Sequence, residues 1–191
     1  MNIEQSNCAN LPTKYGKFKI KAYKDGTQEH LAIMSENFDT LEVPYVRIHS
    51  ECLTGDTLGS LKCDCQNQLD LALKFIAAQG GLVIYHRQEG RNIGLLNKVN
   101  AYALQDQGRN TIEANLELGF NEDDRDYTIV EHIFKDLGVK KLRLITNNPK
   151  KIAYVESLGV EIVQRIPAIT KSNQYNEHYI STKKEHMGHL F

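Results

Sequence analysis

The chain has 191 residues, of which 41% are hydrophobic and 25% charged, and this length suits a single domain with one sizeable core. Its formal net charge of −1 at pH 7 argues against binding to nucleic acid or to a membrane surface, because proteins that bind those partners are usually basic. The sequence contains no apolar run of membrane-spanning length, and its N-terminus does not resemble a signal peptide, so we expect a cytoplasmic protein whose cysteines stay reduced.

Strands are predicted in the first fifty residues and are expected to pair antiparallel. Three segments have the composition of short strands, at 16–24, 29–36 and 43–50. The first of them, GKFKIKAYK, alternates polar and apolar residues, as a strand with one buried face does. The N-terminal part of the chain is therefore predicted to begin a sheet.

Helices and strands alternate from Cys65 onward. Apolar residues at helical spacing and closing glycines predict helices within 66–81, 94–108, 127–139 and 147–159. Strands are predicted at 82–87, 141–146 and 160–166, and the first of these is apolar enough to be buried on both faces. The sequence thus predicts a mixed α/β fold, in which N-terminal antiparallel strands are followed by alternating helix–strand units around one mixed sheet.

We expect one domain over residues 1–191, with residues 1–10 and roughly 171–191 as candidates for mobile ends. The C-terminal stretch, KSNQYNEHYISTKKEHMGHLF, is polar and lacks a clear period. It is therefore expected to be extended, mobile or placed at a subunit contact.

Three of the four cysteines, Cys52, Cys63 and Cys65, lie in one short polar segment, ECLTGDTLGSLKCDC. Thiolates are soft ligands suited to zinc, and the last two can reach one ion if the backbone turns sharply between them. Reduced cysteines buried in a core are the alternative, but core segments are rarely so polar and rich in glycine. Three thiolates leave a fourth position for water, as in catalytic zinc sites, unless Cys8 or His49 completes a closed structural site.

Three polar loops follow predicted strands, at 47–51, 86–94 and 146–151. In α/β sheets such loops meet at the carboxyl ends of the strands, where ligands bind. They carry cations suited to phosphate oxygens, and a helix beginning near Asn148 offers free backbone N–H groups. Each loop alone is most simply a solvated connection, but together with the cysteines they indicate a phosphorylated substrate beside a hydrolytic zinc. The cations are Arg47, Arg87, Arg91, Lys150 and Lys151.

Two acidic features have competing interpretations. Glu89 either pairs with a neighbouring arginine or accepts two hydrogen bonds from a base edge such as that of guanine. The acidic segment 121–126 precedes a predicted helix, where the helix dipole favours negative charge. That account does not explain Arg125 in the middle of the segment.

Seven segments of the chain together resemble GTP cyclohydrolase II, the family of zinc enzymes that opens riboflavin synthesis. They are RIHSECLTGD, CDCQNQL, YHRQEGRNIGLLNK, AYALQDQG, ELGF, TNNPKK and NEHYISTKKEHMGH. The resemblance runs from about Leu11 to His189, and its cysteine spacing is highly specific. It implies an enzyme that opens the imidazole ring of GTP and releases formate and pyrophosphate, which gives 2,5-diamino-6-(5-phosphoribosylamino)pyrimidin-4(3H)-one.

The resemblance also implies cofactors and partners, namely one Zn²⁺ in each subunit, Mg²⁺ carried with the triphosphate, and a homodimer. The family's zinc ligands fall on Cys52, Cys63 and Cys65. Its GTP contacts fall on Arg47, Ile48, His49, Ser50, Glu51, Gln68, Glu89, Gly90, Arg91, Thr111, Thr146 and Lys151.

Three further residues match catalytic positions of the family. Tyr102 matches the tyrosine near the ring-opening chemistry, Asp123 the proton acceptor, and Arg125 the residue proposed as nucleophile at the α-phosphate. Arginine is almost always protonated and is a poor nucleophile, so a role in stabilising phosphate charge stays open beside the covalent one.

Two other functional classes fit the sequence less well. A zinc deaminase of nucleotides is disfavoured, because its H-x-E and P-C-x-x-C signature is missing. A zinc-stapled binding module without catalytic activity fits poorly with near-neutral charge and an open three-ligand site.

Overall fold

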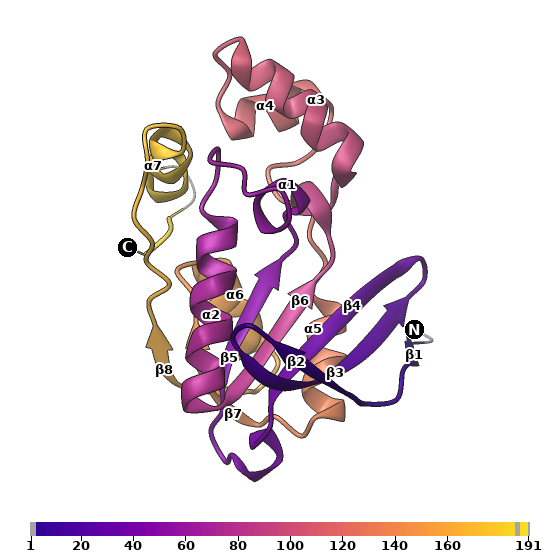
Figure 1. The fold of residues 1–191 in the computed structure, drawn as a ribbon. Coiled ribbons are helices and arrows are strands. Elements are labelled where there is room, and N and C mark those ends of the chain that lie inside the picture. The colour runs from indigo at the N-terminus through magenta and orange to yellow at the C-terminus, as the bar shows by residue number, and fades with distance from the viewer. Residues whose placement is uncertain (1–2, 186–187, 191) are drawn as a thin grey trace.

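One mixed sheet holds the eight strands found in the part of the chain that this computed structural model describes, residues 3–185 and 188–190. The strands lie in the order β1-β3-β4-β6-β5-β7-β8, and β2 also pairs with β3 (Figure 1). Their bounds are β1 Ile3–Gln5, β2 Ala9–Thr13, β3 Gly16–Asp25, β4 Gln28–Ser35, β5 Tyr45–Ser50, β6 Gly81–His86, β7 Lys141–Ile145 and β8 Glu161–Ile166.

Strand directions divide the sheet into two parts. Antiparallel pairs join β1, β2, β3, β4 and β6, whereas β5 pairs in parallel with both β6 and β7, and β7 with β8. The segment 43–50, expected among antiparallel strands, therefore contains a parallel strand. The reason is its connection, because β5 leads through a helix to its neighbour β6, and such a crossover joins parallel strands. The predicted fold class, a mixed α/β fold around one mixed sheet, is confirmed.

Seven α-helices accompany the sheet in the described residues. The predicted helices are present as α2, α3, α5 and α6, whereas the sequence did not predict α1, α4 and α7. None of the helices is both long and apolar enough to cross a membrane. Their bounds are α1 Leu53–Asp56, α2 Cys65–Gln79, α3 Gly94–Asp106, α4 Thr111–Glu117, α5 Thr128–Asp136, α6 Pro149–Ser157 and α7 Glu177–Glu185, with short 3-10 helices at Phe38–Thr40 and Glu89–Asn92.

Helices cover both faces of the sheet, so the core has two parts. Figure 1 shows α2 in front of the sheet and α5 and α6 behind it. Ala72 and Ile76 of α2 are fully buried in the front cluster. Ile133 and Phe134 of α5 and Val155 of α6 are buried in the larger cluster behind. This three-layer packing fixes the strands whose ends carry the loops of the pocket.

Local sequence explains how two elements begin. The Asn148 side chain caps α6 by accepting a hydrogen bond from the Lys150 backbone N–H at 2.9 Å, and Pro149 occupies the first turn. Gly81 begins β6 with a φ of +155°, and a Cβ there would lie 2.1 Å from the Tyr45 carbonyl oxygen. Only glycine therefore lets β6 start so close to β5.

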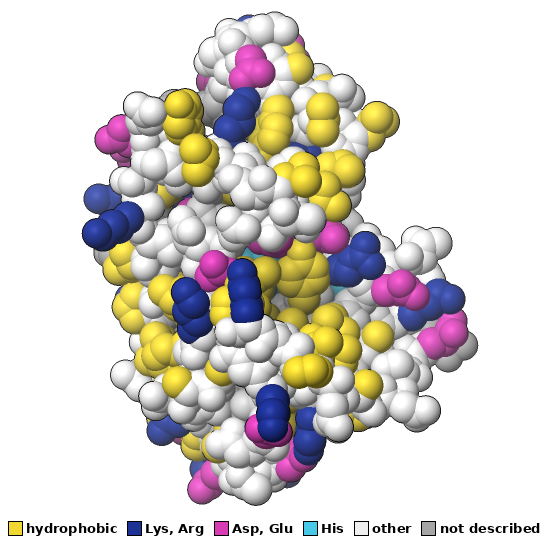
Figure 2. Space-filling view, viewed as in Figure 1, with side chains coloured by type: hydrophobic (Ala, Val, Ile, Leu, Met, Phe, Trp, Pro, Cys, Tyr) yellow, Lys and Arg dark blue, Asp and Glu magenta, His cyan; other side chains and the backbone are white. Residues whose placement is uncertain are grey.

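One group of apolar side chains is left in solvent. Leu95, Leu96 and Val99 of α3 and Leu116 of α4 are exposed. Figure 2 shows hydrophobic side chains gathered on the upper part of the molecule, where Figure 1 places these two helices.

Candidate active site

The loops that follow β5, β6 and β7 meet at one edge of the sheet and surround a pocket, to which α3, α4 and α7 add walls. Most site residues predicted from the sequence line this pocket; Ile48, Asp123 and two of the predicted loop cations, Arg87 and Lys150, do not. The Ile48 side chain lies in the core behind the sheet, although its carbonyl oxygen accepts a hydrogen bond from Lys151. The predicted residues in the wall are Arg47, His49, Ser50, Glu51, Cys52, Cys63, Cys65, Gln68, Glu89, Gly90, Arg91, Tyr102, Thr111, Arg125, Thr146 and Lys151.

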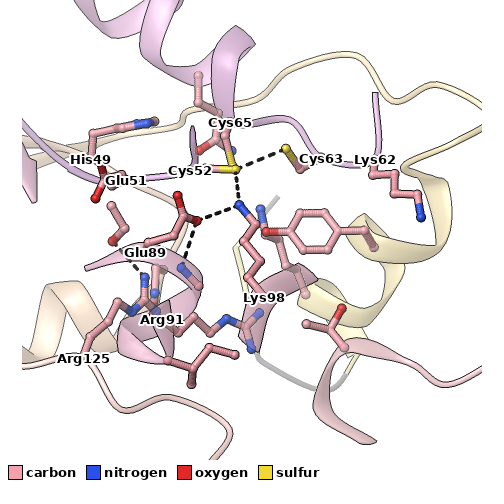
Figure 3. Close-up of a pocket in the computed structure, with 18 of the residues that line it drawn as sticks. His49, Glu51, Cys52, Lys62, Cys63, Cys65, Glu89, Arg91, Lys98 and Arg125 are labelled. Atoms are coloured by element: carbon pink, nitrogen blue, oxygen red, sulfur yellow. Dashed lines mark hydrogen bonds and ion pairs between the residues drawn. The ribbon is translucent and has the colours of Figure 1, made fainter. Parts of the chain in front are cut away.

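The three predicted metal ligands, Cys52, Cys63 and Cys65, converge (Figure 3). Their sulfur atoms all lie within 4.8 Å of one another, and the first two are 3.7 Å apart. Cys52 directly precedes α1, and Cys65 is the first residue of α2. The other candidate ligands, Cys8 and His49, are not in this group. Three soft ligands facing a pocket are the donor set of a zinc site with an open position.

Gly55 in α1 makes room for the cluster. A Cβ at this position would lie 2.8 Å from Cys63 Sγ and 3.0 Å from Cys52 Sγ. The 2.8 Å separation is shorter than real Cβ contacts and the 3.0 Å separation is unusually tight, so any larger residue would force the sulfurs or α1 to shift.

His49 is held away from the sulfurs by a carboxylate. Its Nε2 lies 3.0 Å from Asp56 Oδ1, and Asp56 Oδ2 also accepts hydrogen bonds from the Cys52 backbone N–H at 3.0 Å and the Tyr85 hydroxyl at 2.8 Å. Burial lowers the pKa of His49 despite the carboxylate, so the ring is neutral at pH 7. Asp56 therefore ties Cys52 to the ends of β5 and β6.

Lys98 places a cation against the thiol cluster. Its Nζ lies 3.1 Å from Cys52 Sγ and 2.7 Å from Glu89 Oε1 (Figure 3). Hydrogen bonds from the other two thiols lower the pKa of Cys52, and the Lys98 charge lowers it further, so Cys52 is a thiolate. Burial would lower the pKa of Lys98, but Cys52 and Glu89 outweigh burial and raise it.

Both carboxylate oxygens of Glu89 already accept hydrogen bonds. Oε2 accepts from the Leu53 backbone N–H at 2.6 Å, and Oε1 accepts from the Gly90 backbone N–H at 3.0 Å and from Lys98. A base edge that donated two hydrogen bonds to Glu89 would have to displace at least one of these contacts.

Tyr102 lies one helical turn after Lys98 and approaches the same cluster. Its hydroxyl is 3.1 Å from Thr54 Oγ1, which in turn is 3.7 Å from Cys52 Sγ. Burial raises the pKa of Tyr102, so the phenol keeps its proton at neutral pH and can donate a hydrogen bond into the pocket.

Three buried cations, Arg47, Arg125 and Lys151, line the pocket, and two of them contact Ser50. Arg125 Nη1 donates to Ser50 Oγ at 2.9 Å, and Lys151 Nζ lies 3.2 Å from the same oxygen. Arg47 Nη1 donates to the Ile145 carbonyl at 3.0 Å, and its Nε has no hydrogen-bond partner among the described residues. Burial lowers the pKa of Lys151, and the charges of Arg125 and Arg47 lower it further. Arg47 and Lys151 are held by neutral acceptors, so their charge makes this part of the pocket a site for an anion.

Asp123 forms a bidentate ion pair with Arg125. Its Oδ1 is 2.7 Å from Arg125 Nε, and its Oδ2 is 2.6 Å from Arg125 Nη2. Burial would raise the pKa of Asp123, but the arginine outweighs burial and lowers it. In return the carboxylate raises the pKa of Arg125 against the effect of burial.

The pocket wall also contains residues that were not predicted from the sequence, among them Lys98, Tyr179, Lys183 and His189. The spacing of Lys98 and Tyr102, four residues apart on a predicted helix, was an available signal. Tyr179, Lys183 and His189 lie in the C-terminal segment, whose polar composition gave no helical period to place them.

Comparison with known proteins adds to this geometry. The family model for GTP cyclohydrolase II matches residues 4–167. The chain belongs to the GTP cyclohydrolase II family. This confirms the predicted resemblance and the prediction that the chain is an enzyme.

Curated relatives in the GTP cyclohydrolase II family match the chain from end to end. The protein named GTP cyclohydrolase-2 from Campylobacter fetus subsp. fetus (strain 82-40) is 58% identical, and the match covers 100% of this chain and 97% of that protein. The protein of the same name from Campylobacter hominis is 55% identical over 100% of this chain and 96% of its own length. The one from Helicobacter pylori (strain Shi470) is 53% identical, with 98% of both chains covered.

Proposed function

We propose that the chain catalyses zinc-dependent hydrolysis of GTP, opening the guanine imidazole ring and releasing formate and pyrophosphate, to give 2,5-diamino-6-(5-phosphoribosylamino)pyrimidin-4(3H)-one as the first step of riboflavin biosynthesis. The observation that carries the proposal is that the three-cysteine cluster and the group of buried cations line one pocket. A thiolate metal site suits hydrolysis at a ring carbon, and the cations suit a triphosphate.

The donor set at Cys52, Cys63 and Cys65 fits zinc, since three thiols converge and Gly55 leaves room beside them. When bound, zinc supplies a Lewis acid and lowers the pKa of a bound water from 15.7 to about 7. The protein's own contribution to ring opening is a hydrogen bond from the protonated Tyr102 to the oxygen that gains charge.

The triphosphate is proposed to lie against Arg47, Lys151 and Arg125, with Mg²⁺ bound to its oxygens. Arg125 can stabilise charge at the α-phosphate during pyrophosphate release, and Asn148, the N-cap of α6, lines the same pocket, so the positive end of the helix dipole lies beside it. The other proposed GTP contacts are Ile48, His49, Ser50, Glu51, Gln68, Glu89, Gly90, Arg91, Thr111 and Thr146. We further propose a cytoplasmic homodimer with no nucleic-acid or membrane partner.

Product identification tests this function. Zinc-loaded enzyme incubated with GTP and Mg²⁺ is expected to release formate and pyrophosphate, detected by enzymatic assay, with the pyrimidine product identified by mass spectrometry. Cys63→Ser removes one soft ligand, so it is expected to lose zinc and formate release while circular dichroism stays native.

The control is Cys8→Ser, because Cys8 is exposed and outside the cluster, and its zinc content and rates are expected to match the wild type. Ammonia in place of formate would reassign the enzyme to the deaminases. Full zinc content and full formate release in Cys63→Ser would remove the cysteines from the metal site.

A further inference from the structure

The C-terminal helix α7 lies against the metal-binding loop, outside the region that the family model matches. The match ends at residue 167, and α7 spans Glu177–Glu185. In Figure 1 the chain leaves β8 at the lower left and returns upward to place α7 beside the N-terminal end of α2. Tyr179, Lys183 and His189 from this segment line the pocket.

The first contact is an ion pair at the residue between two metal ligands. Asp64 separates Cys63 from Cys65, and its side chain is 1% exposed. Its Oδ1 lies 2.8 Å from Lys183 Nζ, which is itself buried with 10% of its side chain exposed. Because Asp64 is the residue at which the backbone turns between the two ligands, this ion pair fixes the direction of the turn.

A second contact holds the same turn through its backbone. The Asn176 side chain is fully buried, and its Nδ2 donates to the Cys63 carbonyl oxygen at 3.3 Å. Asn176 also accepts a hydrogen bond from the Ile180 backbone N–H, so it is fixed at the start of α7. Two successive residues of the turn are thus bonded to the two ends of one helix.

Hydrogen bonds link the Lys183–Asp64 ion pair to Arg47, one of the buried cations of the pocket. Asp64 Oδ2 accepts from Gln68 Nε2 at 2.6 Å, and Gln68 Oε1 accepts from Arg47 Nη2 at 2.5 Å. One chain of contacts therefore runs from α7 through the metal-binding turn to one of the three buried cations.

The end of the segment is also docked. The His189 backbone N–H donates to the Lys183 carbonyl oxygen at 3.0 Å, and the Leu190 backbone N–H donates to the Asn147 carbonyl oxygen at 2.8 Å. The described part of the segment therefore closes against the loop that follows β7.

We propose that α7 is a structural part of the active site and that Lys183 is a positioning residue, whose ion pair with Asp64 holds Cys63 and Cys65 in the geometry that binds the metal. The role deepens the proposed function and rests on its assignment of these cysteines as zinc ligands. Lys183 touches neither sulfur, so it acts through the turn. Partners of this kind behind metal ligands typically change metal affinity by 10- to 100-fold when removed.

The test compares two adjacent lysines in the full chain. Lys183→Met removes the ammonium and leaves Asp64 buried without its partner, whereas Lys184→Met removes an equal charge from an exposed position. Zn²⁺ affinity is measured by competition with a chromophoric chelator. We expect roughly 10- to 100-fold weaker binding in Lys183→Met and no change in Lys184→Met.

A second readout does not depend on the metal. Hydrogen–deuterium exchange of the metal-free protein is expected to show faster exchange in 176–185 and 60–66 for Lys183→Met and wild-type rates for Lys184→Met. The double variant Asp64→Asn/Lys183→Met removes both charges, so no buried charge is left unpaired. Its loss of Zn²⁺ affinity is expected to be smaller than the losses of Asp64→Asn and Lys183→Met added together.

The outcomes separate this role from the proposed function. Wild-type zinc affinity together with wild-type exchange in Lys183→Met would overturn the role, as would equal losses in both lysine variants. A wild-type protein that binds no zinc, with the exchange result as expected, would overturn the zinc assignment and leave Lys183 as the residue that holds the turn. If Lys183→Met does not fold, Asp64→Asn removes the same ion pair with no change of shape, and unchanged zinc affinity there overturns the role.

Discussion

Arg125 and Asp123 limit each other's chemistry. Within their bidentate pair Arg125 stays protonated and has no free lone pair for attack, while Asp123 has a lowered pKa and is a weak proton acceptor at neutral pH. The remaining guanidinium nitrogen, Nη1, contacts Ser50 in the pocket. The pair therefore favours an electrostatic role for Arg125 at the α-phosphate, with Asp123 orienting it.

Substitution of Arg125 tests that role. Arg125→Ala is expected to slow pyrophosphate release roughly hundredfold, the usual effect of removing one donor to a developing anion, whereas Arg125→Lys keeps the charge and is expected to lose less. Initial rates of both products give the comparison. Arg109→Ala is the control, since Arg109 pairs with Glu117 in solvent. A nucleotide bound covalently to Arg125 in rapidly quenched samples would contradict the electrostatic role.

At the scale of elements, α1 is a single turn whose function is to bring sulfurs together. It begins directly after Cys52, and its buried Gly55 faces the sulfurs of Cys52 and Cys63. Asp56, at its other end, accepts the Cys52 backbone N–H. A helix this short has little stability of its own, so these tertiary contacts hold it.

The packing of Gly55 predicts a large effect from one methyl group. Gly55→Ala puts a Cβ 2.8 Å from Cys63 Sγ, so we expect at least tenfold weaker Zn²⁺ binding by chelator competition, with the overall fold retained. Thr57→Ala, at an exposed position of the same loop, is expected to bind zinc as the wild type does. Unchanged affinity in Gly55→Ala would mean that the sulfurs hold the metal from another arrangement.

The elements predicted from sequence were those with a strong period or clear ends. α5 and α6 have apolar stripes that end at glycines, whereas α4 is short and is marked mainly by its cap, Asn110, with Glu113 completing a capping box. That cap was readable in the sequence and was overlooked. α7 had no comparable signal, because its buried residues include Thr182 and Lys183, which are polar and are buried only by their tertiary partners.

The residues of the candidate site likewise include some that the sequence signals and others that it does not. Cys52, Cys63 and Cys65 are close in sequence and chemically distinctive, so their spacing alone indicated a metal site. Lys98 contacts this cluster from α3 and Lys183 contacts the turn between two of its cysteines from α7, and an isolated lysine in a sequence carries no sign of burial. Only the folded chain relates them to the sulfurs, because their partners, Glu89 and Asp64, are chosen by packing.

At the scale of the whole molecule, the near-neutral chain concentrates positive charge in one pocket. Burial lowers the pKa of Lys151 well below its ordinary value of 10.5. Between the lowered pKa of Lys151 in the folded chain and 10.5 in the unfolded chain, the unfolded chain binds more protons than the folded one. Lys151 therefore makes the free energy of unfolding rise with pH across that window. An anion bound in the pocket would offset the repulsion of Lys151 by Arg125 and Arg47.

This linkage can be measured with Lys151→Met. The unfolding free energy of the variant minus that of the wild type is expected to decrease as pH rises from 7 toward 10.5, because only the wild type gains stability there. Urea unfolding of the reduced, metal-free proteins gives the values. GTP affinity is expected to fall roughly ten- to hundredfold at pH 7 with the loss of one charged hydrogen-bond donor.

Lys150→Met is the matched control, because Lys150 is the exposed neighbour on the same helix. Its stability is expected to follow the wild-type pH dependence. Parallel pH profiles for wild type and Lys151→Met would show that Lys151 is not the group responsible.

The two ends of the sheet are poorly suited to joining another sheet. At one end β3 is paired with two separate short strands, and β2 contains Pro12, which has no N–H to offer. At the other end β8 carries Glu161, Gln164 and Arg165 along its length. Short strands, proline and charge at the edges all oppose continuous backbone pairing between molecules. The homodimer proposed above would therefore form through side-chain contacts, because the same edges disfavour strand addition between molecules.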